Sequence, residues 1–268
     1  GFVNSGLMTL KQAINVIMGA NIGTTVTAWI LSLGGISGDN FFVQMFKPTS
    51  FTPILALLGI VLYMFCKGDK KNDTGMILLG FATLMFGMDT MSGAVSSLRD
   101  NEAFINILTM FSNPILGIVV GTIFTAIIQS SSASIGILQG LCVTGAVTYG
   151  AAIPIILGQN IGTCVTAMLS SMGAKKNAKT AALMHLFFNI IGTVIFSIAA
   201  IVFFQVVNPA WGRGMITATQ ISTVHTAFNI ATTVLLFPFS NFIIKLAKMI
   251  GGMKSEEENH TLLSLDDR

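Results

Sequence analysis

Long apolar segments separated by short polar ones run through most of this chain. A helix needs about 20 residues to cross the hydrocarbon core of a bilayer, and six segments approach or exceed that length. The predicted spans are residues 12–33, 51–66, 74–97, 150–172, 180–206 and 217–244. Residues 113–147 are also apolar, but a polar run interrupts them, so they predict a re-entrant helical hairpin. Polar backbone at that depth is stable only where protein or a cavity covers it.

A block of sequence occurs twice within this pattern. Residues 1–35 and 140–174 align without a gap at a constant offset of 139, and 16 of the 35 paired positions are identical. The best-matched part reads Gly-Ala-Asn-Ile-Gly-Thr at 19–24 and Gly-Gln-Asn-Ile-Gly-Thr at 158–163. Because glycines and oxygen-bearing side chains lie inside apolar segments, both copies are predicted to be broken helices beside a small-solute site.

The composition agrees with a membrane protein. Hydrophobic residues make up 53% of the chain and charged residues only 9%, against about 25% charged in a typical soluble domain. The net charge of +3 is small and its basic residues form short clusters, which argues against a nucleic-acid-binding protein. Three cysteines in or beside apolar segments do not form a disulfide framework. The predicted fold class is an all-α integral membrane protein.

The basic clusters predict how the chain is oriented. Nine of its 14 basic residues are the lysines of loops 67–73 and 174–179 together with Lys245, Lys248 and Lys254 after the last span. Counting spans puts all three clusters on one side, which the positive-inside rule makes cytoplasmic. The same count makes the two copies of the repeat inverted relative to each other, as in many secondary transporters. We expect a multi-pass protein of the cell membrane with a cytoplasmic C-terminal tail.

This layout divides the chain into two halves and a tail. Residues 1–112 contain the first repeat and the helices that follow it, and residues 113–250 contain the second repeat with its hairpin, broken helix and two spans. Residues 251–268 are acidic and predict a linker to a further region. Position 1 aligns with Gly140, in mid-hairpin. We therefore expect a partner of the polar run upstream of residue 1 in a longer natural protein.

The polar run itself, Gln129-Ser-Ser-Ser132, is the first candidate for chemistry. Short helices are predicted on its two sides, at 114–128 and 134–147, and the N-terminus of the second points into the break. A helix N-terminus attracts anions, and serine hydroxyls donate to an anion or turn their oxygens to a cation. We predict that Gln129, Ser130, Ser131 and Ser132 bind an anion. The alternative is that the serines only join neighbouring helices.

The two Asn-Ile-Gly-Thr segments supply neutral oxygen atoms, which suit a hard monovalent cation such as Na⁺. The predicted Na⁺ ligands are Asn21, Thr24, Thr25, Gln129, Ser130, Asn160 and Thr163. The glycines of these segments also predict a close helix crossing. No Lys or Arg lies near either motif in the sequence, so a bound cation would supply the charge that a buried anion needs. Anion and cation would then raise each other's affinity.

Three further side chains are candidates with open alternatives. Asp89 is the only acid well inside a predicted span, so it is assigned either a coupling role or a structural one. His185 and His225 each precede an Asn by four residues, which places His and Asn one helical turn apart. Interhelical hydrogen bonds are the preferred interpretation of this pair, and a metal site is the alternative.

Together these motifs resemble the type II sodium–phosphate cotransporter family in its bacterial branch. The matching pieces are Thr125–Ala133, both Asn-Ile-Gly-Thr segments, both His-x-x-Phe-Asn segments and Gly87–Ser92. The resemblance implies a transporter rather than an enzyme, a secondary-active symporter that moves inorganic phosphate with sodium ions. It implies that Gln129 to Ser132 match the substrate and ion motif and that a helical phosphate-signalling region follows the acidic tail. Cys164 departs from the pattern, because the first copy has Thr25 at that position.

Two other functions are weighed against symport. An intramembrane serine hydrolase would use one of Ser130–Ser132 with His185 or His225 as its base, but the sequence lacks a Gly-x-Ser-x-Gly elbow. A membrane anchor or sensor of a phosphate-regulatory complex would bind phosphate without moving it. The sequence leaves open whether the protein forms a homo-oligomer.

Overall fold

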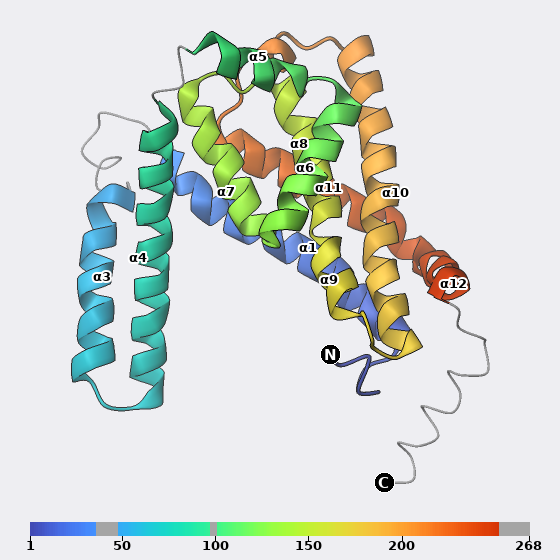
Figure 1. Cartoon of the computed structure of the whole chain (residues 1–268), viewed down its shortest axis with the longest axis horizontal. Coiled ribbons are helices and arrows are strands. Elements are labelled where there is room, and N and C mark those ends of the chain that lie inside the picture. Colours follow the sequence, from blue (N-terminus) through green and yellow to red (C-terminus); the bar gives the residue numbers. More distant parts are fainter. Residues whose placement is uncertain (36–47, 97–100, 252–268) are drawn as a thin grey trace.

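A computed structural model describes residues 1–35, 48–96 and 101–251 (Figure 1). These described residues are helical and contain no β-strand apart from one isolated bridge between Thr148 and Met215. Five of their helical segments are long and apolar enough to cross a membrane, which confirms the all-α membrane class. The five are Leu10–Ser32, Asp69–Met91, Tyr149–Ser170, Lys176–Val206 and Ala218–Gly251. Residues 252–268, most of the predicted acidic linker, lie outside the described part.

The helices in chain order are α1 (Leu10–Ser32), α3 (Pro48–Phe65), α4 (Asp69–Ser96), α5 (Glu102–Met110), α6 (Pro114–Ile128), α7 (Ser131–Leu141), α8 (Tyr149–Gly162), α9 (Cys164–Ser170), α10 (Lys176–Val206), α11 (Ala218–Leu236) and α12 (Ser240–Gly251). Short 3₁₀ turns join some of them: η1 (Leu33–Gly35), η2 (Cys142–Thr144), η3 (Ala210–Arg213) and η4 (Phe237–Phe239).

One predicted span is shorter than a bilayer core, and another, confirmed as the membrane-length segment Ala218–Gly251, contains a break. The span at 51–66 is α3, whose apolar part, Ser50–Phe65, is one of the shorter apolar helices. Its length is about 24 Å at 1.5 Å per residue, less than the roughly 30 Å of a hydrocarbon core. The span at 217–244 is divided into α11 and α12 by η4, which contains Pro238. Proline lacks a backbone N–H, so the α-helical hydrogen-bond ladder ends there.

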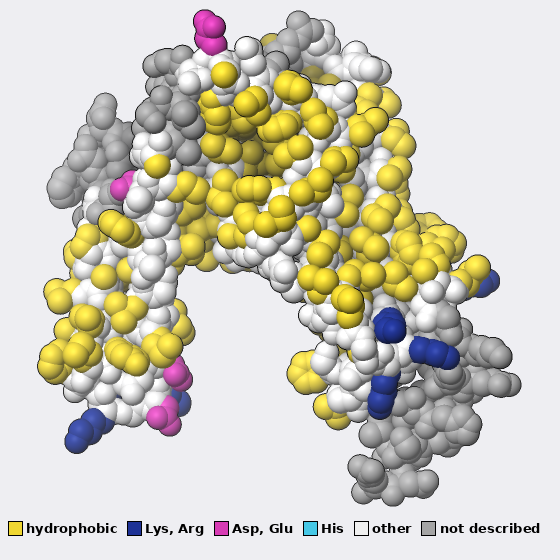
Figure 2. Space-filling model, viewed as in Figure 1, with side chains coloured by type: hydrophobic (Ala, Val, Ile, Leu, Met, Phe, Trp, Pro, Cys, Tyr) yellow, Lys and Arg dark blue, Asp and Glu magenta, His cyan; other side chains and the backbone are white. Residues whose placement is uncertain are grey.

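The helices form a body and an arm (Figure 1). In the body, α6 and α7 make a hairpin that packs beside α8, while α1 and α11 cross the other helices obliquely and contact each other. The arm is the antiparallel pair α3 and α4, and α4 joins it to the body through contacts with α7. Figure 2 shows that the arm stands away from the body over its lower part.

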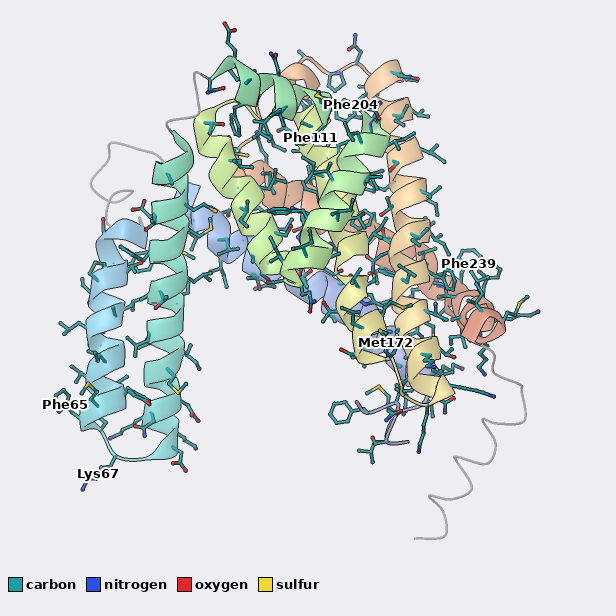
Figure 3. All side chains as sticks on the ribbon, viewed as in Figure 1. Phe65, Lys67, Phe111, Met172, Phe204 and Phe239 are labelled. Carbon is teal, nitrogen blue, oxygen red and sulfur yellow. The ribbon has the colours of Figure 1, made fainter. Side chains whose placement is uncertain are left out.

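Lysine side chains gather at one end of the molecule. Figure 2 shows them at the lower end in this view, where Figure 3 labels Lys67 on the arm and Met172 on the body. Exposed lysines of both predicted cytoplasmic loops lie there: Lys67, Lys70, Lys71, Lys175, Lys176 and Lys179. The two loops share one end of the molecule, as the count of spans requires. Which side of the membrane this end faces stays a prediction.

Helix α8 lies at the centre of the packing. Residues 151–160 are all buried, and Ile156 and Leu157 belong to an apolar cluster that includes Phe228 of α11. A second apolar cluster joins α1, α10 and α12 through side chains such as Ile14 and Phe188. Large apolar side chains cover much of the outer surface as well, as expected where lipid rather than water is the solvent (Figure 2).

The duplicated block has the same local structure in both copies. Thr9 caps α1 and Thr148 caps α8, each through its side-chain oxygen. The paired glycines before these caps, Gly6 and Gly145, both have positive φ angles, of 80° and 66°. The repeat is therefore a structural unit. The inverted orientation of its copies stays a prediction.

The prediction that both copies are broken at Asn-Ile-Gly-Thr is wrong for α1, which is continuous from Leu10 to Ser32. In the second copy only Thr163 separates α8 from α9, and its φ and ψ of −61° and −25° are those of a helix. The reason is local. A glycine costs a helix only about 1 kcal/mol relative to alanine, and the Asn and Thr side chains bond carbonyls of their own helix. The backbone carbonyls expected to be freed there are not free.

Glycines let α6 and α8 pack backbone to backbone. A Cβ atom added at Gly158 would overlap the carbonyl oxygen of Ile118, and one added at Gly162 would lie 2.6 Å from the carbonyl oxygen of Thr122. The close helix crossing predicted from these glycines is confirmed in the second copy. In the first copy, Gly19 and Gly23 are exposed, with no other atom of the described chain within 4 Å of an added Cβ.

This asymmetry predicts opposite effects of one substitution at paired positions. Gly158→Ala should lower the free energy of unfolding by about 1–3 kcal/mol, the usual cost of overpacking. Gly19→Ala is the matched control and should be neutral or stabilising by up to about 1 kcal/mol through helix propensity. Unfolding in mixed detergent micelles, followed by circular dichroism, measures both. Equal effects would show that the α6–α8 contact tolerates a side chain.

Candidate functional site

The polar run lies at the tip of the α6–α7 hairpin, and the predicted helix at 114–128 is confirmed as α6. Gln129 ends α6 in the left-handed conformation, with φ 58° and ψ 23°, and its N–H donates to the carbonyl of Thr125 at 2.7 Å. Ser130 is extended and caps α7, its Oγ accepting from the N–H of Ala133 at 3.2 Å. The break is therefore only two residues long, and α7 begins at Ser131 rather than at 134 as predicted.

Buried hydroxyls fix the tip to its neighbours. Thr125 Oγ1 of α6 and Ser134 Oγ of α7 are 2.7 Å apart, and both residues are fully buried. From α8, the Gln159 amide donates to the carbonyl of Ser134 at 3.0 Å. Because both helices of the hairpin and α8 share these bonds, the start of α7 is held in one position.

A pocket of ≈ 240 Å³ opens beside the start of α7. Its polar lining comes from both copies of the repeat and from the hairpin: Asn21, Thr24, Ser131, Asn160 and Thr163. Val16, Ile17, Ala20 and His185 complete the wall. We call this cavity the tip pocket. It brings together five residues predicted from separate sequence motifs, up to 142 positions apart.

The two copies present the same atoms to the tip pocket. Asn21 Nδ2 donates to the carbonyl of Ile17 at 2.9 Å, and Asn160 Nδ2 to that of Ile156 at 2.8 Å. Thr24 and Thr163 donate their hydroxyl protons to the carbonyls of the same two asparagines, at 2.7 and 2.6 Å. Each threonine hydroxyl proton and one amide proton of each asparagine are thereby used within their own helix. The oxygen lone pairs of these amides and hydroxyls are acceptors and cation ligands.

The start of α7 presents the opposite character. The N–H groups of Ala133 and Ser134 are bonded to Ser130. Those of Ser131 and Ser132 have no partner among the described residues, as expected for the first turn of a helix. These N–H groups, the Ser131 and Ser132 hydroxyls and the positive end of the helix dipole are suited to an anion.

Among the described residues, His185 is the only titratable side chain that lines the tip pocket. The sequence flagged it only through its repeated His-x-x-x-Asn spacing. The His-x-x-x-Asn motif that begins at His185 makes the predicted interhelical bond through its asparagine. Asn189 Nδ2 of α10 donates to Cys164 Sγ of α9 at 3.3 Å. His225 is buried in α11, and Nδ1 of its ring has no partner in the described residues. Within the described part of the chain, no three His, Cys, Asp or Glu side chains could hold a metal ion.

Other predicted site residues do not line the tip pocket. Gln129 is exposed, and Ser130 and Ser132 are half-buried at the hairpin tip. Thr25 is buried and donates to the carbonyl of Ile22 at 2.7 Å. Asp89 is exposed on α4, which belongs to the arm. Ser131 is thus the serine of the polar run that lines the pocket. The groups named in this paragraph lie at its margin or away from it.

A second cavity, of ≈ 290 Å³, shares Val16, Ile17 and His185 with the tip pocket. Its wall also includes Ala167, Ser170 and Ala178, close to the start of α10 and its lysines. The tip pocket therefore shares part of its wall with a cavity on its side toward the basic end of the molecule.

Comparison with known proteins finds a matching family model and several relatives. A family model described as Na⁺/Pi-cotransporter matches residues 1–93 and 84–207 of the chain. Two bacterial relatives match over almost the whole chain. The uncharacterized protein YqeW of Bacillus subtilis is 28% identical over 269 residues, 93% of this chain and 76% of that protein. The putative inorganic phosphate export protein YjbB of Escherichia coli is 22% identical over 264 residues, 98% of this chain and 45% of that protein.

A human relative matches over a shorter length. Sodium-dependent phosphate transport protein 2B is 34% identical over 129 residues, 45% of this chain and 19% of that protein. The chain thus spans less than half the length of YjbB and of the human protein. No solved structure matches the chain.

The cap at the hairpin tip gives a stability prediction. Ser130→Ala should lower the free energy of unfolding by about 1 kcal/mol, because the N–H of Ala133 loses its acceptor. Ser132→Ala is the matched control, since its hydroxyl makes no hydrogen bond to the described residues. Unfolding in mixed micelles measures both variants. A neutral Ser130→Ala would mean that the break holds its shape without the cap.

Proposed function

The chain belongs to the Na⁺/Pi-cotransporter family, and from that premise we propose that it is a secondary-active symporter that binds inorganic phosphate and Na⁺ together at the tip pocket. The observation that carries the proposal is the lining of this pocket. Acceptor oxygens of both repeat copies and the N-terminus of α7 meet in one cavity, although the motifs lie far apart in sequence. Membrane-spanning helices and relatives named as phosphate transporters agree with transport.

Phosphate is assigned to the start of α7. Free N–H groups and hydroxyls of Ser131 and Ser132 would donate to its oxygens, and Gln129 and Ser130 would complete the cradle at the hairpin tip. A tetrahedral anion accepts many hydrogen bonds, and a helix N-terminus supplies them without a mobile cationic side chain. Neutral donors alone leave most of the charge of the anion uncompensated.

Sodium is assigned to the oxygen atoms of the repeat. Asn21 and Thr24 offer one set and Asn160 and Thr163 a matching set, because each hydroxyl and one N–H of each amide already bond their own helix. Two unit charges about 4 Å apart attract by roughly 4 kcal/mol at an effective dielectric constant of 20. Among the described residues no Lys, Arg, Asp or Glu lines the tip pocket, so this attraction would make each ion strengthen the binding of the other.

Access is assigned to the basic end in this conformation. The second cavity lies beside the tip pocket, on the side of that end, which the positive-inside rule makes cytoplasmic. Movement of the hairpin against α1 would close this path and open one to the other side. The direction of net transport would follow the ion gradients, so one site could serve uptake or export.

The serine hydrolase is not proposed. Ser131 and His185 line the same pocket, but no hydrogen bond joins them, and a general base must reach the proton that it removes. Within the described residues, no carboxylate lines the pocket to orient the histidine.

Phosphate transport tests the anion site directly. In proteoliposomes with an inward Na⁺ gradient, Ser131→Ala and Gln129→Ala should lower the initial rate of labelled phosphate uptake at least tenfold, a loss of about 1.4 kcal/mol or more. Thr83→Ala is the control, because its hydroxyl is exposed on the arm and bonds only its own helix. Wild-type rates in both site variants would make the hairpin tip structural. Equal uptake with and without the gradient would overturn the Na⁺ coupling.

The cation site has its own signature. Asn21→Ala and Asn160→Ala should raise the Na⁺ concentration for half-maximal uptake several-fold and change phosphate affinity less at saturating Na⁺. Each substitution removes one oxygen ligand of Na⁺ and leaves the hydrogen-bond donors at the start of α7 intact. Asn15→Ala, on the exposed face of α1 outside the tip pocket, is the control. A larger effect on phosphate affinity than on Na⁺ would exchange the two assignments.

A further inference from the structure

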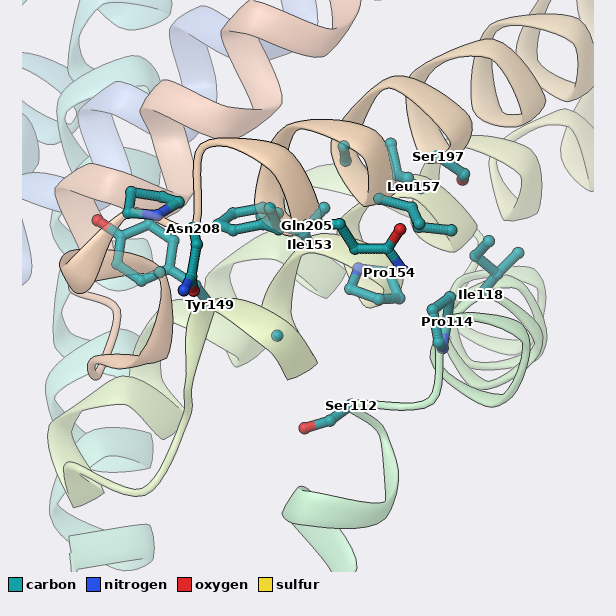
Figure 4. Close-up of a pocket in the computed structure, with 16 residues that line it drawn as sticks. Ser112, Pro114, Ile118, Tyr149, Ile153, Pro154, Leu157, Ser197, Gln205 and Asn208 are labelled. Atoms are coloured by element: carbon teal, nitrogen blue, oxygen red, sulfur yellow. The ribbon is translucent and has the colours of Figure 1, made fainter.

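A cavity of ≈ 600 Å³ lies between α6, α8 and α10, and none of its lining residues belongs to the tip pocket (Figure 4). We call it the α10 groove. Its size falls within the range of small-molecule sites, roughly 300–1,000 Å³. Ile118, Pro154 and Leu157 form apolar walls along it, with Phe204 toward one end.

Most polar residues of the α10 groove cluster at that same end, while Ser197 lies at the other limit of its wall on α10. Ser112 precedes α6, Tyr149 begins α8, and Gln205 and Asn208 lie at the end of α10. Figure 4 shows the Ser112 hydroxyl and the Gln205 amide extending from opposite sides of the opening. Among the residues whose side chains the structure describes, no Lys, Arg, Asp or Glu lines the groove. The described polar side chains are therefore suited to a group with hydrogen-bonding oxygens and no net charge.

Aromatic side chains mark the level of this end in the membrane. The rings of Tyr149 and Trp211 are 4.9 Å apart, and those of Phe204 and Trp211 are 5.6 Å apart. Tyr and Trp concentrate at the interface between lipid and water. The lysines at the start of α10 are at the opposite end of that helix. The groove thus opens at the interface away from the basic end.

The depth of the groove matches one leaflet. Its wall on α10 runs from Ser197 to the end of the helix at Val206. At 1.5 Å per residue this is about 14 Å, close to half of a hydrocarbon core of about 30 Å. The outer faces of the same helices are apolar and exposed, for example at Ile115 and Val202. A chain of the surrounding lipid can enter from the side without leaving the hydrocarbon.

We propose that the α10 groove binds one phospholipid without net charge from the leaflet opposite the basic end. One acyl chain fills the apolar slot, and Ser112 and Gln205 donate hydrogen bonds to head-group or ester oxygens. Selectivity resides in the polar end, because an acyl chain gains little by moving from bulk lipid into an equally apolar slot. The proposal does not depend on phosphate transport.

Fluorescence quenching by brominated lipids tests this site. Trp29→Phe leaves Trp211, at the polar end of the groove, as the only tryptophan. Vesicles contain rising fractions of brominated phosphatidylethanolamine or brominated phosphatidylglycerol. Quenching of Trp211 should reach half its maximum at a fraction about five-fold lower for phosphatidylethanolamine, as expected for a few modest hydrogen bonds.

Two adjacent alanines provide the variant and its control. Ala200 lines the groove, so Ala200→Phe should fill it and remove the difference between the two lipids. Ala199 is exposed and outside the groove, so Ala199→Phe should preserve that difference. Circular dichroism and gel filtration identify variants that fail to fold. Two results would overturn the proposal. One is equal quenching by both lipids in the protein that keeps Ala200, and the other is the same lipid preference in Ala200→Phe and Ala199→Phe. Absent quenching together with dimers cross-linked through Val202→Cys would assign the groove to a second copy instead.

Discussion

The backbone contact between α6 and α8 is the constraint on which the rest of the site depends. Gly158 and Gly162 leave no room for side chains, so the two helices approach until their backbones touch. This contact fixes α6, and the two-residue turn at Gln129 and Ser130 then fixes where α7 begins. Bonds from Thr125 and Gln159 to Ser134 hold that position. Glycine packing along an apolar helix thereby places a helix N-terminus inside the membrane domain.

The chemistry of the tip pocket follows from which hydrogen bonds its polar groups already donate. Asn and Thr of both copies donate to carbonyls of their own helix, which keeps the helices intact and turns oxygens outward. Within the described residues, the N–H groups of Ser131 and Ser132 have no acceptor. Oxygen acceptors and helix N-terminal donors therefore border one small cavity, and no charged side chain of the described residues lines it. Under the proposed function, such a cavity would favour a cation and an anion together over either one alone.

The tip pocket and the α10 groove differ because they meet different surroundings. The tip pocket lies among helices that carry buried polar side chains, and a neighbouring cavity lies on its side toward the lysine-rich end. The α10 groove lies on an apolar face, with most of its polar groups near the helix ends and an aromatic cluster beside them. Polar groups inside the bundle are suited to solutes, whereas polar groups at helix ends are suited to lipid head groups.

The sequence by itself determined the helical membrane class, the hairpin with its start at Pro114 and its break at Gln129, and the residue types of the site. Those features depend on hydropathy, helix propensity and short-range capping, which are local. It did not determine that α1 stays continuous through Asn21 to Thr24, because a side chain that bonds its own helix and one that opens it look alike in sequence. The tertiary structure alone decided that Asn21 and Asn160 line one pocket with Ser131 and that His185 joins them. It also decided that Gly158 is packed while its partner Gly19 is open. These outcomes depend on which helices cross, and that is set by contacts between residues far apart along the chain.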